Sequence, residues 1–508
     1  MKLTKHIAAF FCLVLLCQCA WFKKTPAIDP ITPEEELRNA LIEKLFTPET
    51  RNGFWGVIVK KLGDEKPILY WNGGKNLLPA SNMKLYTTAA ALALLGKDFR
   101  YETLIYTTGE IGADGVLRGD VIIQGSGDPA ISGRYVPGTL TTDIILKGWV
   151  AALRSKGIKS IEGNIIGDDD YFADYDLEGT WENDDLFYWY AAPSTALAIN
   201  DNLYDIFITP AKNAGEKALL EYKPKTNYVT FKCDVITTDA KGRTDIDFLR
   251  GWEDNNVQIF GQIPLGGRRY RDKGCVYNPT LYAATLVHES LTSEGISISG
   301  KPIDMDDFTP EEKEEIRSRG KPLHTHLSPP ITDIIRYVNK YSQNFYADML
   351  LKTLGKKFKG EGTFRAGARV VREFIKEAGA PDADNFLMRD GSGLSRRNFV
   401  QPRQTIRLLE YMASHPDFEA FYDSLPIAGV DGTIGSRMKQ PPAKNNIRAK
   451  TGFISHTRSL SGYADDRSGA SWVFCFMCNN FTADVGSVDD LIDEMCQILA
   501  NYGNGASE

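Results

Sequence analysis

Hydrophobic positions in the first hundred residues change their period from one segment to the next. Apolar residues fit a short helix at 35–47, and then alternate with polar ones at 53–62 and 68–73, with Gly and Asp between the two runs. The segment PASNMKLYTTAAALALLG at 79–96 is apolar along most of its length and ends at a glycine. The pattern predicts a helix, a strand pair joined by a turn, and a buried helix, in this order.

The pattern changes between about 100 and 305, where short β-rich runs dominate and helices are few. Helical spacing returns at 327–355 and near 364–378, 403–413 and 485–501, and late strands are expected at 447–453, 457–465 and 471–480. We therefore predict a multi-domain α/β fold. Residues 34–100 and 306–503 form one discontinuous domain, and a β-rich inserted region, 101–305, forms one or two domains of its own.

Composition narrows the class of protein. A chain of 508 residues is too long for a single core, and 43% apolar with 25% charged residues is typical of globular domains. The formal net charge of −7 argues against a nucleic-acid partner, which would require a basic face.

The N-terminus is typical of an export signal, predicted at 1–19. Lys2 and Lys5 precede the apolar run Ile7–Leu16, which is too short to span a bilayer. The end of the signal has two interpretations. The segment LLCQC resembles a bacterial lipoprotein signal in which Cys19 is lipidated and anchors the protein to a membrane, although Gln18 stands where a small residue is usual; ordinary cleavage nearby is the alternative. Either way, we expect an exported, periplasmic protein.

The cysteines beyond the signal are odd in number and sparse, which argues against a disulfide scaffold. Cys475 and Cys478 lie in an apolar run and are interpreted as buried thiols of a core strand. Cys233 with Cys275 is a candidate bridge.

Ser81 and Lys84 lie three residues apart in the first turn of the predicted buried helix, so their side chains share one face. A serine hydroxyl needs a base to become a nucleophile, and burial lowers the pKa of a lysine toward neutrality. This spacing alone is common, and a helix cap beside a surface lysine is the alternative interpretation.

Two further segments supply complementary chemistry. Ser342 and Asn344, at the approach to a helix, could relay a proton and hold a substrate amide. Lys450, Thr451 and Gly452 lie in a predicted strand, where the lysine offers positive charge to a carboxylate and the glycine allows close backbone approach.

In this order, the three elements resemble the active-site serine penicillin-recognising enzymes. RDGSGLSRRN (389–398), LPIAGVDGTI (425–434) and RAKTGFISHTRSLSGY (448–463) are similar to class C low-molecular-mass penicillin-binding proteins, which are D-alanyl-D-alanine carboxypeptidases and endopeptidases. That family also carries a large insert between its first two motifs, and the resemblance covers nearly all of 35–500. It implies a transpeptidase-like domain, with a helical lobe and a five-stranded antiparallel sheet around one cleft.

The resemblance implies a role for each motif. Ser81 would be acylated by a peptidoglycan stem peptide, with Lys84 as its base. Ser342 would pass the proton to the leaving D-alanine amine, and Asn344 would bind the acyl-side amide. β-Lactam antibiotics would acylate the same serine and leave slowly, and no metal or organic cofactor is implied.

The third motif departs from the family pattern at one position. Lys450, with Thr451 beside it, would attract the terminal carboxylate, and the backbone N–H groups of Ser81 and Phe453 would form the oxyanion hole. A hydroxyl residue is usual in the family where this chain has Phe453, which favours endopeptidase over carboxypeptidase activity.

The segment GTWENDDLFYWYAAP resembles a family loop whose acid reaches the free amine of the stem-peptide diamino acid. Asp185 is the best match, Asp184 is its neighbour, and Trp181 would flank the same pocket; a solvated acidic turn is the alternative.

Several other patterns favour structural roles. Asp390–Ser392 and Asp431 fit tight turns, the acidic run 167–179 fits a solvated loop better than a divalent-cation site, and the pair His324 and His326 fits a strand better than a zinc site.

Two other functions share the serine motifs. A serine β-lactamase has a far shorter insert and a glutamate motif that is not evident here. A catalytically inactive wall-binding lipoprotein is disfavoured because all three motifs are intact.

Overall fold

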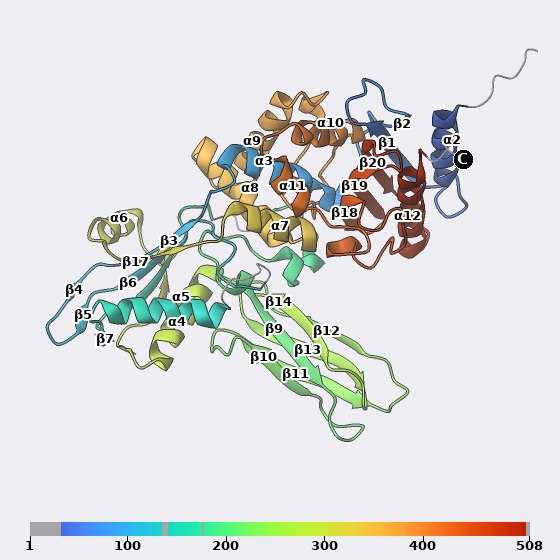
Figure 1. Ribbon diagram of the computed structural model, residues 1–508. Coiled ribbons are helices and arrows are strands. Elements are labelled where there is room, and N and C mark those ends of the chain that lie inside the picture. Colours follow the sequence, from blue (N-terminus) through green and yellow to red (C-terminus); the bar gives the residue numbers. More distant parts are fainter. Residues whose placement is uncertain (1–31, 135–140, 175–176, 504–508) are drawn as a thin grey trace, which may run out of the picture.

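The computed structural model describes residues 32–134, 141–174 and 177–503. A body of helices packed on a sheet adjoins an elongated inserted region (Figure 1). Cys19 and the predicted signal lie outside the described residues. Within them, no helix is both long and apolar enough to cross a membrane.

One five-stranded antiparallel sheet joins the two ends of the chain, in the order β18-β19-β20-β1-β2. β1 pairs with β20 along its whole length, from Phe54 opposite Asn479 to Lys61 opposite Trp472. The strands are β1 (Phe54–Lys61), β2 (Leu69–Trp71), β18 (Arg448–Ile454), β19 (Thr457–Asp465) and β20 (Ser471–Asn479).

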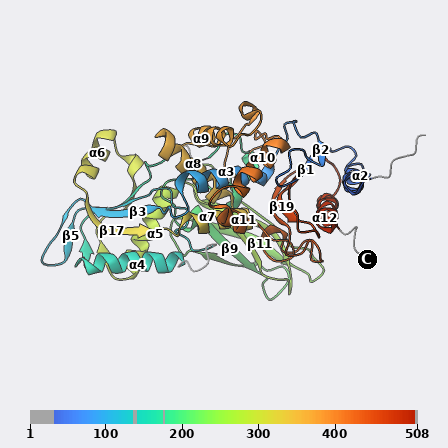
Figure 2. The ribbon, with the colours of Figure 1, turned by 45° about the horizontal axis from the view of Figure 1, so that its top comes forward.

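This sheet is covered on both faces, which explains why β20 is apolar almost throughout. Helices α2 (Pro33–Leu45) and α12 (Val485–Asn501) pack together on one side, and the helical lobe packs on the other (Figures 1 and 2).

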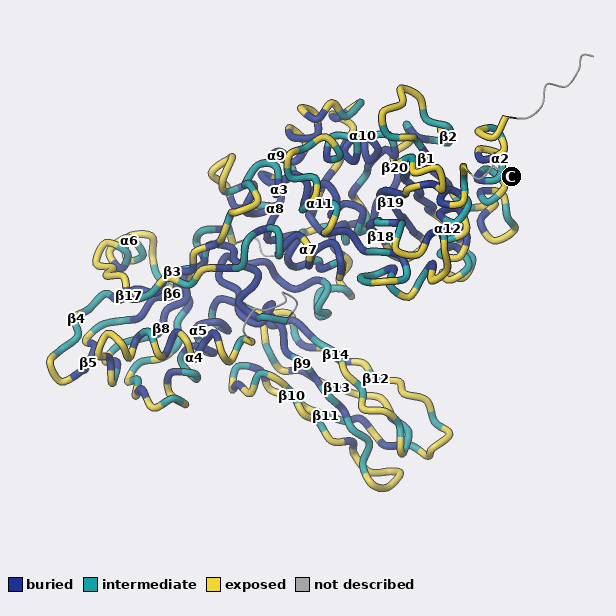
Figure 3. The backbone as a smooth tube through the Cα atoms, in the orientation of Figure 1, coloured by how far each residue is buried: buried dark blue, intermediate teal, exposed yellow. Residues whose placement is uncertain are grey.

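The helical lobe surrounds α3 (Met83–Leu95), whose residues 83–92 are all buried (Figure 3). Because the helix is apolar on every side, it requires neighbours on every side. These neighbours are α7 (Ile331–Tyr341), α8 (Asn344–Lys359), α9 (Phe364–Glu377) and α11 (Phe418–Ser424), while α10 (Pro402–Ala413) packs on β1 and β20.

The inserted region begins with a second five-stranded sheet, in the order β16-β8-β6-β3-β17. Its strands are β3 (Glu102–Thr107), β6 (Val121–Gln124), β8 (Ile165–Asp168), β16 (Pro302–Asp304) and β17 (Lys321–Leu327). A smaller sheet beside it contains β4 (Glu110–Ile111), β5 (Val116–Arg118), β7 (Ser160–Ile161) and β15 (Ser297–Ile298).

An arm of two three-stranded sheets projects from the inserted region (Figure 1). It consists of β9 (Leu203–Thr209), β10 (Leu219–Lys223), β11 (Thr230–Thr238), β12 (Asp245–Leu249), β13 (Asn256–Pro264) and β14 (Tyr270–Cys275). Its outer strands carry many exposed residues (Figure 3).

The structure adds two details to the predicted inserted region. Long helices α4 (Thr142–Ser155) and α5 (Pro279–Ser293) cover its first sheet, with α6 (Pro310–Ser318) nearby, so helices are more prominent than the pattern predicted. β17 pairs antiparallel with β3. We therefore propose that the inserted region ends at Leu327 rather than at residue 305.

Candidate active site

Ser81 and Lys84 lie where the chain enters α3. A short 3₁₀ turn, η1 (Ala80–Asn82), precedes the helix, and Ala80 adopts a left-handed φ of 46°. The Lys84 side chain is completely buried, and its Nζ lies 2.9 Å from Ser81 Oγ. The hydroxyl and the amine are therefore within hydrogen-bond reach, as expected from their spacing.

Two further contacts orient the Lys84 amine. Its Nζ donates to Asn344 Oδ1 at 2.7 Å and to the Ser392 carbonyl at 2.6 Å. Both oxygens can only accept, so a neutral amine gives its two N–H groups to them. The remaining lone pair then points at the Ser81 hydroxyl, which is the geometry of a base beside its nucleophile.

Burial lowers the pKa of Lys84 to about 7, against the opposing charges of Asp348 and Asp390. Burial also lowers the pKa of Lys450 well below its usual range, with the nearby charge of Lys84 as a second cause. An uncharged Lys84 is therefore available near neutral pH.

A second serine–lysine pair lies across the site. Ser342 ends α7 in a left-handed conformation, with φ 57°, and places its hydroxyl 2.9 Å from the Nζ of Lys450 on β18. Lys450 also donates to the Thr451 carbonyl at 2.8 Å. Asn344 at the start of α8 contacts Lys84, so the three predicted motifs meet in space.

Gly452 allows β18 to lie directly against the turn that carries Ser81. A Cβ atom at this position would lie 2.1 Å from Ser459 Oγ and 2.6 Å from the Pro79 carbonyl, so any side chain would separate the two segments. Asn82 fixes the same contact by donating to the Lys450 carbonyl at 2.9 Å.

The middle of the edge strand β18 carries a hydroxyl pair that sequence reasoning missed. Thr451 Oγ1 donates to Thr433 Oγ1 at 2.8 Å, from the short helix η7 (Gly432–Ile434). Phe453 is 61% exposed, and the Arg458 guanidinium lies 3.7 Å from the centroid of its ring. Thr433 thus places a second hydroxyl beside β18, the strand in which Phe453 stands where the family usually has a hydroxyl residue.

The turn at 390–393 is also part of the site. Asp390 is buried, and its carboxylate accepts from Gly393 N, Ser395 N, Asn398 Nδ2 and Trp181 Nε1. This network agrees with the turn interpretation of RDGSGLS. The contact of Ser392 with Lys84 was not foreseen, because it joins segments 308 positions apart.

The loop at 181–191 brings the inserted region to the site. Trp181 is buried, with its indole N–H donated to Asp390, while Asp184 is exposed. Asp185, at the end of η2 (Asn183–Asp185), is half-buried and accepts from Tyr190 Oη at 3.1 Å. The Tyr190 carbonyl accepts in turn from Asn344 Nδ2 at 2.8 Å, and Asn344 contacts Lys84, so Asp185 lies three contacts from Lys84.

Comparison with models of protein families shows the family to which the chain belongs. Residues 37–502 match the model of the D-Ala-D-Ala carboxypeptidase 3 (S13) family. The chain belongs to this family. The family predicted from the motifs is therefore confirmed, and the protein is a hydrolase of the D-Ala-D-Ala carboxypeptidase type.

Two curated members of the S13 family resemble most of the chain. A D-alanyl-D-alanine carboxypeptidase of Actinomadura sp. (strain R39) is 29% identical over 451 residues, 85% of this chain and 79% of the relative. D-alanyl-D-alanine carboxypeptidase DacB of Haemophilus influenzae is 29% identical over 440 residues, 85% of this chain and 87% of the relative.

The crystal structure of penicillin binding protein 4 (dacB) from Haemophilus influenzae has the same fold. The TM-score is 0.79 at 27% identity, over 91% of this chain and 99% of the other. A structure of that relative with a bound β-lactam gives a TM-score of 0.72 at 27% identity, over 92% of this chain and 98% of the other. The predicted fold class, a helical lobe on a five-stranded sheet with a large insert, is confirmed.

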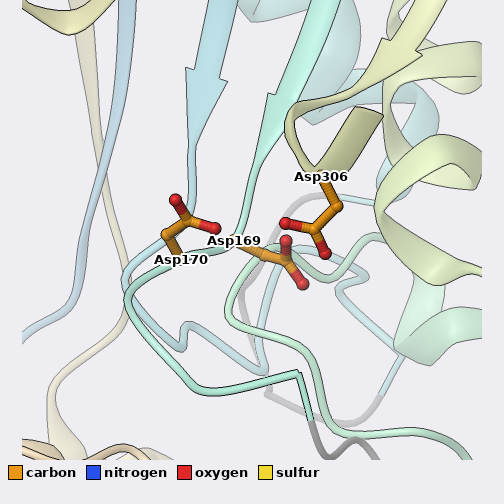
Figure 4. Close-up of side chains that lie close together, drawn as sticks. All are labelled: Asp169, Asp170 and Asp306. Carbon is orange, nitrogen blue, oxygen red and sulfur yellow. The ribbon is translucent and has the colours of Figure 1, made fainter. Parts of the chain in front are cut away.

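Outside the site, three aspartates from the inserted region gather at one point. Single carboxylate oxygens of Asp169, Asp170 and Asp306 lie within 4.8 Å of one another (Figure 4). Lys313 donates to both Asp170 and Asp306, at 2.8 and 2.6 Å, and Arg317 pairs with Asp170. These cations balance much of the negative charge, so the cluster by itself indicates no metal site.

The remaining candidates have structural roles. His324 and His326 lie on β17 as strand residues. Cys233 on β11 and Cys275 on β14 are free thiols, so a bridge between them is wrong for this structure. Cys475 and Cys478 are free and buried, as predicted, and Cys496 is a further free and buried thiol.

Proposed function

We propose that the protein is a serine DD-peptidase that cleaves D-Ala-D-Ala termini or peptide crosslinks of peptidoglycan through an acyl-enzyme on Ser81. The observation that carries this proposal is the buried Lys84 amine, 2.9 Å from the Ser81 hydroxyl and bound on its other side by two oxygens that can only accept. This geometry fits a base and a nucleophile better than a helix cap.

In the first step, Lys84 takes the Ser81 proton while Ser81 Oγ bonds to the penultimate D-alanine carbonyl carbon. The tetrahedral intermediate then breaks its C–N bond, and the proton held by Lys84 passes through Ser342, whose hydroxyl contacts Lys450, to the leaving D-alanine amine, so that Lys84 is neutral again. In the second step water attacks the ester carbonyl and Lys84 takes the water's proton. This proton returns to Ser81 Oγ as the ester C–O bond breaks and the shortened peptide leaves. A β-lactam acylates Ser81 by the same first step, but its ester with Ser81 is hydrolysed slowly.

The Thr451–Thr433 hydroxyl pair on the edge strand β18 offers a site for the terminal carboxylate. Lys450, Thr451 and Thr433 would bind it, and Thr433 would supply the hydroxyl that Phe453 cannot. A carboxylate that accepts hydrogen bonds from several donors is bound more specifically than a carboxylate that is held by one charge alone.

Asp185 is the proposed contact for the free amine of the stem-peptide diamino acid. It is half-buried, and burial is the largest cause that raises its pKa, so a bound ammonium would stabilise its charged form. Asp184 is the exposed neighbour. Trp181 would act from beneath the pocket, since its indole is buried and bonded to Asp390.

Export to the periplasm follows from the predicted signal at 1–19 and from the location of peptidoglycan. Lipidation of Cys19 would anchor the protein to a membrane, and ordinary cleavage would release it. Mass spectrometry of the N-terminus of the protein from its membrane fraction distinguishes the two.

A fluorescent penicillin tests the central proposal. We expect it to label the wild-type protein covalently and to be released slowly. The Ser81→Ala variant should not be labelled. Defined monomeric and crosslinked muropeptides, followed by mass analysis, then identify the cleaved bond. Rapid penicillin turnover would indicate a β-lactamase instead, and a folded wild-type protein that never labels would indicate an inactive binding protein.

A further inference from the structure

A buried acid, Asp348, lies one helical turn after Asn344 on α8. It is 1% exposed, and the two side chains share one face of the helix because they are four residues apart. Asn344 contacts the Lys84 amine directly. Asp348 does not contact the amine but contacts the backbone of residues 391 and 392, and the Ser392 carbonyl in turn contacts the Lys84 amine.

The Asp348 carboxylate holds the turn at 390–393 by two successive N–H groups. Its Oδ1 accepts from Gly391 N at 2.8 Å and from Ser392 N at 3.0 Å. The carbonyl of Ser392, on the same residue as the second of these donors, is the acceptor that lies 2.6 Å from Lys84 Nζ. Fixing the N–H groups therefore fixes the carbonyl that orients the amine.

The turn is also held from the side of α3. Thr87, one turn after Lys84, donates to the Gly391 carbonyl at 2.8 Å. Gly393, with φ +85°, packs so closely on the Ser81 turn that a Cβ atom would lie 1.9 Å from the Ala80 carbonyl. The turn is thus clamped between the helix that carries Lys84 and the helix that carries Asn344.

We infer that Asp348 is a positioning residue for the general base: it holds the turn at 390–393, and the Ser392 carbonyl of this turn holds the Lys84 amine against Ser81. The inference rests on the proposed function, because it assigns Lys84 as the base.

The charge of Asp348 adds a second effect. Lys84 becomes an ammonium when it takes the Ser81 proton, and the charged groups around it are Lys450 from β18, Asp390 from the turn and Asp348 from α8. The two carboxylates favour the ammonium, whereas Lys450 disfavours it when charged. Burial raises the pKa of Asp348, with Asp390 as the next cause, and the charge of Lys84 opposes this rise.

Two substitutions separate position from charge. Asp348→Asn keeps an oxygen for the two N–H groups and removes the charge. We expect its maximal rate of acylation by penicillin to fall less than about tenfold, and the acid limb of its pH profile to move to lower pH, because Lys84 loses a counter-charge. Asp348→Ala also loses the acceptor, and its maximal rate should fall about a hundredfold because the amine is misplaced.

Two further variants complete the experiment. Thr87→Val removes only the second hold on the turn and should lower the rate several-fold with an unchanged acid limb. Asp128→Asn is the matched control, since it neutralises another buried aspartate in the inserted region and should leave acylation unchanged. Circular dichroism and thermal unfolding establish that each variant is folded.

A folded Asp348→Ala protein that is acylated at the wild-type rate would overturn the inference. Should that variant not fold, an unmoved acid limb in Asp348→Asn together with a wild-type rate in Thr87→Val would overturn it equally. A wild-type protein that is never acylated would refute the proposed function instead.

Discussion

The two sides of the candidate active site each contain a serine hydroxyl 2.9 Å from a buried lysine amine, but they are built differently. Ser81 and Lys84 come from one turn of the chain. Ser342 and Lys450 are 108 positions apart, and meet only because α7 ends beside β18. The first pair is a local structure, and the second depends on the tertiary fold.

The difference teaches how the two pairs divide the proposed chemistry. Lys84 has two oxygens on its far side that leave its lone pair for Ser81. Lys450 precedes Thr451 on β18, whose hydroxyl pairs with that of Thr433, and a substrate carboxylate would bind there. We expect the first pair to govern proton abstraction, and the second to govern the leaving group and its recognition.

Replacing the base should have the largest effect. Lys84→Met should lower the rate of acylation by penicillin about 10³- to 10⁴-fold, since general-base catalysis and the orientation of Ser81 are both lost. Stopped-flow labelling measures the rate. Lys352→Met, which removes another fully buried lysine from α8, is the control. Equal losses in the two folded variants would show that the effect is not specific to the first pair.

The second pair should respond less strongly. Ser342→Ala leaves Ser81 and Lys84 in place but breaks the proposed proton path to the leaving amine, so acylation should slow about 10²-fold. Ser342→Thr, which keeps a hydroxyl, should recover part of the rate. A loss in Ser342→Ala as large as that in Lys84→Met would end the proposed division of roles.

The pH dependence should belong to the first pair. Lys84 has a pKa of about 7 and must be uncharged to act, so acylation should fall about tenfold per pH unit below this value and level off above it. Rates between pH 5 and 9 give the profile. In Ser342→Ala the plateau should drop while the limb stays, and a shifted limb would mean that the pairs titrate together.

The smallest effect is expected at the Thr451–Thr433 hydroxyl pair. Thr433→Val should lower kcat/KM about tenfold for an acyl-D-Ala-D-Ala substrate with a free carboxylate, because a hydrogen bond to a charged group is lost. The same substrate with a C-terminal amide should change less than about twofold, and Thr433→Ser should behave like the wild type. Equal losses on both substrates would argue that Thr433 only supports the loop.

The sequence predicted those features of the site that depend on local residue spacing and on the order of the motifs. Ser81 and Lys84 are three residues apart, so their contact follows from helical geometry, and Lys450 lies in a strand, β18, as predicted. Thr433, Asp348 and the Ser392 carbonyl were missed, because their contacts depend on how distant segments pack.

One error of the sequence prediction could have been avoided, because the hydrophobic pattern already indicated the helix α4. The apolar residues of α4, which include Ile145, Trp149 and Leu153, recur at helical spacing within a segment that was assigned as mainly strands. The later end that we propose for the inserted region has no such signal, because the short strand β17 is polar and mostly exposed, and only its pairing with β3 associates it with that region.

That pairing has a consequence for the history of the molecule. The chain enters the inserted region at Tyr101 and leaves it at Ser328, and these two residues exchange hydrogen bonds: Tyr101 N to Ser328 Oγ at 2.9 Å, and Ser328 N to the Tyr101 carbonyl at 3.0 Å. A segment whose ends meet can be acquired, enlarged or replaced at a single junction without displacing the scaffold around it. The inserted region therefore joins the scaffold at one closed junction, at which it could have entered the chain as a unit.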